Sequence, residues 1–221
     1  MMLFIFSIFE AKSQFSKPIS VGIGGGGTIL FGDHGWALIS YGAHVDVDAL
    51  VTPFISAGIN GQAGKLLGDD FGGRRMENKY ITVNGNAKVR AGQFFNNTDN
   101  YSFYILKDKS LVSYLANFYV GAGVGVIFSN VAANRQVVDE RIVPKVSGNE
   151  YFTELVIPLN VGIDIPFGHS IYGPKWAVNI NYSYLFPTSD NLDGYVSPVS
   201  DVSDTYAYLS LGVKMALFNR N

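Results

Sequence analysis

The sequence predicts an all-β fold, an eight-stranded antiparallel up-and-down transmembrane β-barrel. Three observations lead to this fold class: long segments that alternate apolar and polar residues, connections rich in Gly, Asp, Asn and Ser, and an apolar face without charge. Alternation with a period of two residues is the signature of a half-buried strand. Most of these segments also exceed the roughly 9–11 residues that a tilted strand needs to cross a bilayer.

Composition excludes several other classes of protein. Of the 221 residues, 48% are hydrophobic and only 15% are charged, against about 25% charged in an average globular chain. Disordered chains and coiled coils are both far more charged, so neither fits. The absence of cysteine excludes disulfide scaffolds and thiolate metal sites. A net charge of −2 gives no reason to expect nucleic-acid binding.

The amino terminus has the pattern of a secretory signal. An apolar run over residues 3–9 is followed by the small residues Ala11 and Ser13, spaced as at a cleavage site. We therefore expect a signal peptide over residues 1–14 and a barrel domain over 15–221. No segment of the sequence contains the ~18 uninterrupted apolar residues of a transmembrane helix, so any membrane crossing has to be made by strands.

Eight strands follow from the alternation, most clearly within residues 154–167, where every odd position is apolar. The expected ranges are 18–31, 36–47, 53–64, 80–94, 115–128, 153–167, 175–186 and 206–218. Residues 101–106 are a candidate ninth strand, and residues 108–114 a short helix. A soluble sandwich or ligand-binding barrel also alternates, but it points its apolar face inward. A membrane barrel points that face at lipid.

Aromatic and charged residues favour the membrane barrel. On the apolar face of the last seven strands no position is charged, and the aromatic residues fall toward the strand ends, as in the girdles of membrane barrels. The expected girdle residues are Phe118, Phe167 and Trp176 at one rim, and Phe128, Tyr182, Tyr184 and Phe186 toward the other.

The opposite face carries charges of both signs, which an eight-stranded barrel would enclose. Its interior is just wide enough for side chains, and buried charges must be paired. We expect three cations and three carboxylates to form an interior polar network: Lys88, Arg90, Lys214, Asp46, Glu154 and Asp164.

The last strand resembles the carboxy-terminal signal that the outer-membrane barrel assembly machinery reads. That signal has a polar residue, a glycine and two hydrophobic residues at fixed spacing, and Ser210, Gly212, Met215 and Leu217 match it. The chain departs from it by continuing to Asn221. Residues 115–128 similarly resemble a strand of small barrels of the OmpA type.

This resemblance implies a protein of the bacterial outer membrane that contacts membrane lipid and lipopolysaccharide. We further expect a monomer without a cofactor, and a barrel without the peptidoglycan-binding domain of full-length OmpA proteins. Both termini would be periplasmic, with the connections 32–35, 65–79, 129–152 and 187–205 on the outside. The principal function expected is a structural or surface-interaction role.

Other functions would each require specific features of the sequence. A narrow channel or apolar-ligand conduit would require a continuous lumen. A lipid-modifying enzyme would need a serine, a histidine and a carboxylate together, and His169-Ser170 resembles a pair in barrel lipid A deacylases. A glycine pattern at 22–27 fits a dinucleotide fingerprint, but strand-like sequence follows it where that fingerprint needs a helix. We therefore expect no catalytic residues and no metal.

Overall fold

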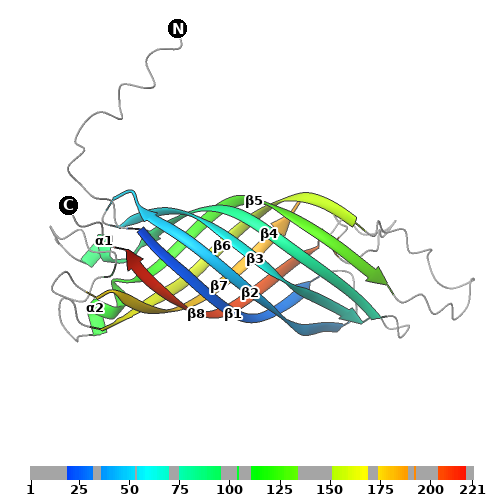
Figure 1. Ribbon diagram of the computed structural model, residues 1–221, viewed down its shortest axis with the longest axis horizontal. Helices are drawn as coiled ribbons and strands as arrows, with labels where there is room; N and C mark the ends of the chain where they lie inside the picture. The colour runs from blue at the N-terminus through cyan, green and yellow to red at the C-terminus, as the bar shows by residue number, and fades with distance from the viewer. Residues whose placement is uncertain are drawn as a thin grey trace, which may run out of the picture.

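Eight strands close into a single antiparallel barrel in the computed structural model of the chain (Figure 1). The structure describes residues 19–31, 36–52, 54–69, 75–95, 104, 111–133, 151–168, 174–188, 192 and 204–217. Each strand pairs with its neighbours in chain order, and β1 pairs with both β2 and β8, so the sheet has no free edge. The strands are β1 (Ile19–Phe31), β2 (Trp36–Leu50), β3 (Ile55–Asp69), β4 (Arg75–Arg90), β5 (Phe118–Ala133), β6 (Tyr151–Phe167), β7 (Trp176–Pro187) and β8 (Thr205–Leu217).

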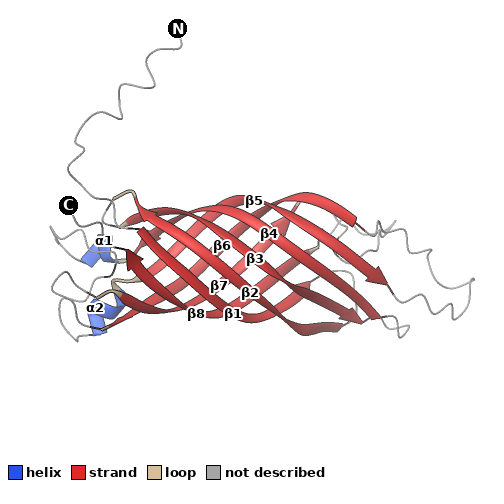
Figure 2. Cartoon of the chain, viewed as in Figure 1, coloured by secondary structure: helices blue, strands red, loops and turns tan. Residues whose placement is uncertain are grey.

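The two ends of the barrel differ. At one end, here called the helix end, β1 begins, β8 ends, and the β4–β5 connection forms α1 (Gly92–Phe95) and α2 (Leu111–Leu115) (Figure 2). The β1–β2, β3–β4, β5–β6 and β7–β8 connections lie at the other, the loop end. Within the described part of the chain, no helix is long and apolar enough to cross a membrane.

The predicted strands are confirmed in number and order, with changes at their ends. The expected strand over 80–94 ends at Arg90, because α1 follows it, and the expected start of the next strand at 115 moves to Phe118, because α2 precedes it. The helix expected over 108–114 corresponds to α2. Of the candidate ninth strand only Tyr104 is among the described residues, and the pairing of β1 with β8 leaves no edge for another strand.

β3 and β4 are longer than the sequence pattern predicted. Their pairing continues to Asp69 and Arg75 because, on the inward side, Leu66 and Asn78 are both fully buried. On the outward side Lys65 forms an ion pair with Glu77 at 2.8 Å. These outward charges interrupt the apolar alternation, which is why the sequence alone indicated a loop over 65–79.

The barrel is apolar outside and polar inside. Apart from Lys65, Glu77 and Lys79 near the loop end of β3 and β4, the exposed side chains on the outward face are mostly aliphatic or aromatic, for example Ile39, Ile59, Val124 and Leu209. The inward positions between them hold buried Asn, Ser, Asp and Lys residues. A soluble ligand-binding barrel requires the reverse arrangement, so that alternative is wrong.

Candidate functional site: the closed lumen

The lumen is built from the inward positions of all eight strands, and glycines on β1 and β5 make room for its largest side chains. A Cβ atom on Gly22 would collide with the Asp46 carboxylate and lie 2.8 Å from Cγ of Lys214. A Cβ atom on Gly121 would lie 3.0 Å from Cγ of Lys88. Close packing of this kind explains why glycine occupies these inward positions.

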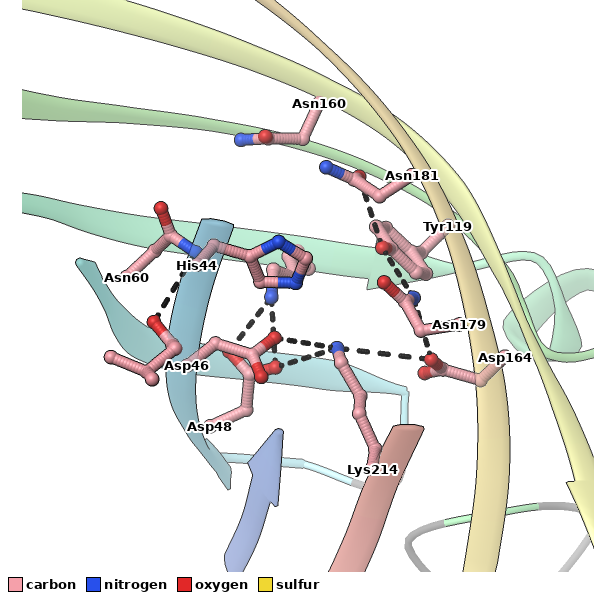
Figure 3. Close-up of polar contacts among 12 residues, drawn as sticks. His44, Asp46, Asp48, Asn60, Tyr119, Asn160, Asp164, Asn179, Asn181 and Lys214 are labelled. Atoms are coloured by element: carbon pink, nitrogen blue, oxygen red, sulfur yellow. Dashed lines mark hydrogen bonds and ion pairs between the residues drawn. The ribbon is translucent and has the colours of Figure 1, made fainter. Parts of the chain in front are cut away.

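Lys214 is the centre of a buried ion cluster (Figure 3). Its Nζ atom lies 3.1 Å from Oδ1 of Asp46, 3.2 Å from Oδ2 of Asp48 and 3.7 Å from Oδ1 of Asp164. Only 2% of Lys214 is exposed. A buried ammonium is tolerated only when carboxylates compensate the lost hydration, and here β2 supplies two of them and β6 the third.

Two further cations complete the cluster. Lys88 Nζ donates to both carboxylate oxygens of Asp48, at 2.9 and 2.8 Å. Arg90 Nη2 lies 3.4 Å from Oδ2 of Asp164. The cluster therefore contains three cations and three carboxylates, so its formal charges balance. Its members are Asp46, Asp48, Lys88, Arg90, Asp164 and Lys214.

Tyr119 and two asparagines surround the ion cluster with hydrogen bonds. The Tyr119 hydroxyl donates to Oδ1 of Asn181 at 3.0 Å and accepts from Nδ2 of Asn179 at 2.9 Å. Asn179 Nδ2 also donates to Asp164 at 2.8 Å. Both lysine Nζ atoms lie 5.6 Å from the centre of the Tyr119 ring, within the range of a cation–π interaction.

A small polar cavity adjoins the cluster. Its volume is about 20 Å³, enough for one or two water molecules. Around it, Asn160 donates to Asn86 at 3.1 Å and accepts from Ser183 at 2.7 Å. The Nδ1 atom of His44 lies 3.0 Å from the Tyr208 hydroxyl. The lining residues are His44, Asp46, Asn60, Asn86, Lys88, Tyr119, Asn160, Asn179, Asn181, Ser183 and Tyr208.

Apolar side chains fill the lumen on either side of this polar zone. At the helix end, Leu50, Tyr104, Ala177 and Ala216 form a small buried cluster. Toward the loop end lies a larger one, here called the apolar plug, formed by Leu30, Leu66, Met76, Tyr80, Ile127, Val131, Val156, Leu185, Leu192 and Tyr206.

The apolar plug includes a residue from outside the strands. Leu192, in the β7–β8 connection, is fully buried, and its carbonyl accepts a hydrogen bond from Asn78 Nδ2 at 2.8 Å. The sequence pattern did not predict the plug, because the interior was expected to be a polar network. The available signal was a single apolar residue at an inward position near the loop end of several strands: Leu66 of β3, Val156 of β6 and Leu185 of β7.

The predicted interior network differs from the observed cluster in one member. Asp48 takes the place expected for Glu154, which lies ten residues from Asp164 on the same strand and pairs across the sheet with Ile127. Glu154 is therefore toward the loop end, too far along β6 to join Lys214. Asp48 was missed because the sequence pattern ended its strand at residue 47, whereas β2 continues to Leu50.

The predicted girdle residues lie on the outward face. Phe167 pairs with Trp176 at the helix end, and Phe118 is outward at the start of β5. Toward the loop end, Tyr184 stacks on Phe31, a residue that the sequence analysis did not single out, with ring centres 5.9 Å apart. Phe128, Tyr182 and Phe186 are also exposed.

The four residues that resemble the assembly signal lie on β8, the strand that closes the barrel. Gly212 pairs with Gly24 of β1, and Ser210 faces inward and is buried. Leu217 is exposed on the outward face, and Met215 pairs with Trp176.

No catalytic or metal site is apparent within the described ranges. No group of three or more His, Cys, Asp or Glu side chains there is arranged to hold a metal ion. His44 contacts the Tyr208 hydroxyl rather than a serine. The candidate pair His169-Ser170 lies outside the described residues.

A closed sheet, an aliphatic exterior and a charged, filled interior define an eight-stranded β-barrel of the outer-membrane type. No protein-family model matches the chain, and no curated protein matches its sequence.

Solved structures of outer-membrane proteins are similar to the chain at low sequence identity. The attachment invasion locus protein Ail of Yersinia pestis is 12% identical, with 92% of this chain and 100% of that chain covered and a TM-score of 0.50. Neisserial surface protein A is 10% identical, with 89% of this chain and 96% of that chain covered and a TM-score of 0.49. OprG of Pseudomonas aeruginosa is 9% identical, with 92% of this chain and 98% of that chain covered and a TM-score of 0.43.

Proposed function

We propose that this outer-membrane-type barrel is a non-conducting envelope protein. In this role the barrel anchors the chain in the membrane, and its loop end contacts lipopolysaccharide or partners outside the cell. The sequence of β8 supports delivery by the barrel assembly machinery, and the filled lumen and unbroken sheet are compatible with a monomer.

The filled lumen is the observation that carries this proposal. A pore must offer ions a continuous aqueous path, whereas this lumen contains a neutralised ion cluster, a cavity for one or two waters and the apolar plug. Two members of the plug, Tyr80 and Tyr206, pack against each other with ring centres 5.1 Å apart. The same features argue against an open conduit for apolar ligands.

Conductance across planar lipid bilayers tests the proposal. Purified protein folded into the bilayer should give no current steps above the lipid baseline in molar KCl. A general porin inserted by the same procedure provides the positive control, and the boiling-dependent gel shift of the sample shows that the barrel is folded. Reproducible single-channel steps from the folded protein would contradict the proposal and favour the channel alternative.

A further inference from the structure

α2 turns its apolar side chains away from the protein. Leu111, Val112 and Leu115 are exposed, Leu111 to 75%, while Ser113 and Asn117 are buried against the barrel. A short helix at the surface of a soluble protein has the opposite orientation, because its apolar stripe covers the core. The apolar side chains of α2 therefore face outward, as they do in the barrel wall.

Hydrogen bonds fix this orientation. Asn117 donates from Nδ2 to the carbonyl of Ser113 at 3.1 Å, and its own carbonyl accepts from the backbone N–H of Asp164 at 3.2 Å. The backbone N–H of Gly92 donates to the carbonyl of Ala116 at 3.0 Å, which ties the start of α1 to the end of α2. α2 therefore cannot roll over to bury its apolar side without breaking these bonds.

The exposed apolar residues continue the outward face of the barrel. Phe118, the first residue of β5, is separated from the end of α2 by two residues, and its carbonyl accepts from the backbone N–H of Ala91 at 2.8 Å. On the same end of the barrel, Phe167 and Trp176 form part of the aromatic rim. Phe94 of α1 is 77% exposed. We define the helix-end patch as Phe94, Leu111, Val112 and Leu115.

We propose that the helix-end patch is embedded in the phospholipid interface of the adjacent membrane leaflet, which makes α2 an interfacial anchor of the barrel. The inference rests on the proposed membrane function. Short apolar surfaces next to a bilayer insert into the region between headgroups and acyl chains. Lipid is favoured over a second copy of the chain or another protein, because only two residues separate α2 from Phe118, where the lipid-facing wall begins, and backbone hydrogen bonds join α1 to the same junction.

Nitroxide scanning tests this placement, and the chain suits it because it contains no native cysteine. Single labels are placed by Leu111→Cys and Leu115→Cys. Matched controls are Leu209→Cys on the outward face, which is 57% exposed, and Thr52→Cys in the β2–β3 turn at the same end. Each variant is folded into vesicles of phosphatidylethanolamine and phosphatidylglycerol, and the boiling-dependent gel shift verifies its fold.

The readout is the accessibility of each label to oxygen, which concentrates in lipid, relative to a water-soluble nickel complex. We expect labels at 111 and 115 to give oxygen-to-nickel ratios several-fold above that at 52 and below that at 209, as for an interfacial depth. Ratios equal to that at 52 would overturn the inference, as would shielding from both reagents, which indicates contact between protein copies. An aqueous result at 209 as well would instead contradict the membrane function itself.

Discussion

At the scale of single residues, Lys214 holds the interior together. It contacts three carboxylates from two other strands, so its removal leaves the ion cluster with one uncompensated negative charge. Truncating one partner of a buried ion pair typically costs about 3–5 kcal/mol. Exposed ion pairs are worth far less because water and salt screen them.

Replacing Lys214→Met should therefore lower the free energy of unfolding by about 3–5 kcal/mol. The matched variant Lys79→Met, on the outer wall and 3.7 Å from Glu77, should change it by less than about 1 kcal/mol. Urea titrations in lipid vesicles, followed by tryptophan fluorescence, measure both. Equal stability of the two variants would show that Lys214 is not buried among carboxylates.

At the scale of elements, β1 shows how sequence composition fits a strand to its place in the barrel. Gly22, Gly24 and Gly26 face inward, and β1 thereby leaves space for Asp46 and His44 of the neighbouring strand. Gly27 faces outward, where an added Cβ would meet only Cγ2 of Ile39, at 3.5 Å, and a backbone oxygen at 3.7 Å. The two faces of one strand therefore have opposite tolerance for a side chain.

This difference predicts that Gly22→Ala destabilises the barrel by about 1–3 kcal/mol, since overpacking displaces Asp46 and Lys214. Gly27→Ala should be neutral or stabilise by up to about 1 kcal/mol, because alanine restricts the unfolded chain without a clash. The midpoint of urea unfolding in vesicles distinguishes them. The inward assignment of Gly22 would be wrong if its alanine variant were as stable as that of Gly27.

Much of the strand arrangement could be predicted from the sequence. The two-residue period of a strand coincides with the alternation between an apolar side that faces lipid and a side that faces the interior. The eight strands followed from the alternation, and the inward position of Lys214 followed from the alternation together with the charge-free, aromatic-rimmed opposite face. The strand ends did not, since Lys65 and Glu77 break the apolar pattern while the pairing continues. The apolar plug was hidden for a related reason: Leu66 and Leu185 occupy inward positions, and parity gives a side chain's direction but not its depth along the barrel.

At the scale of the whole molecule, the exterior should tolerate charge according to depth in the bilayer. Val124 lies near the middle of β5, and Tyr151 is the first residue of β6 at the loop end; both are exposed. Lysine on a lipid face costs about 2–4 kcal/mol at the midplane and about 0–1 kcal/mol near the interface. In water both positions would accept lysine equally.

Val124→Lys should consequently destabilise the protein by about 2–4 kcal/mol in vesicles, and Tyr151→Lys by no more than about 1 kcal/mol. Urea unfolding in vesicles of fixed lipid composition provides the comparison. A negligible cost at Val124 would be inconsistent with a lipid-facing wall.

The central claim is that the chain is a closed barrel whose apolar surface faces lipid. Its most direct test is electrophoresis in SDS, with and without boiling, of protein folded in lipid vesicles and of protein diluted into buffer alone. We predict that the unboiled vesicle sample runs as a compact band that boiling shifts, whereas the chain aggregates without lipid or detergent. A soluble, monodisperse protein in buffer that shows no shift in either sample would contradict the claim.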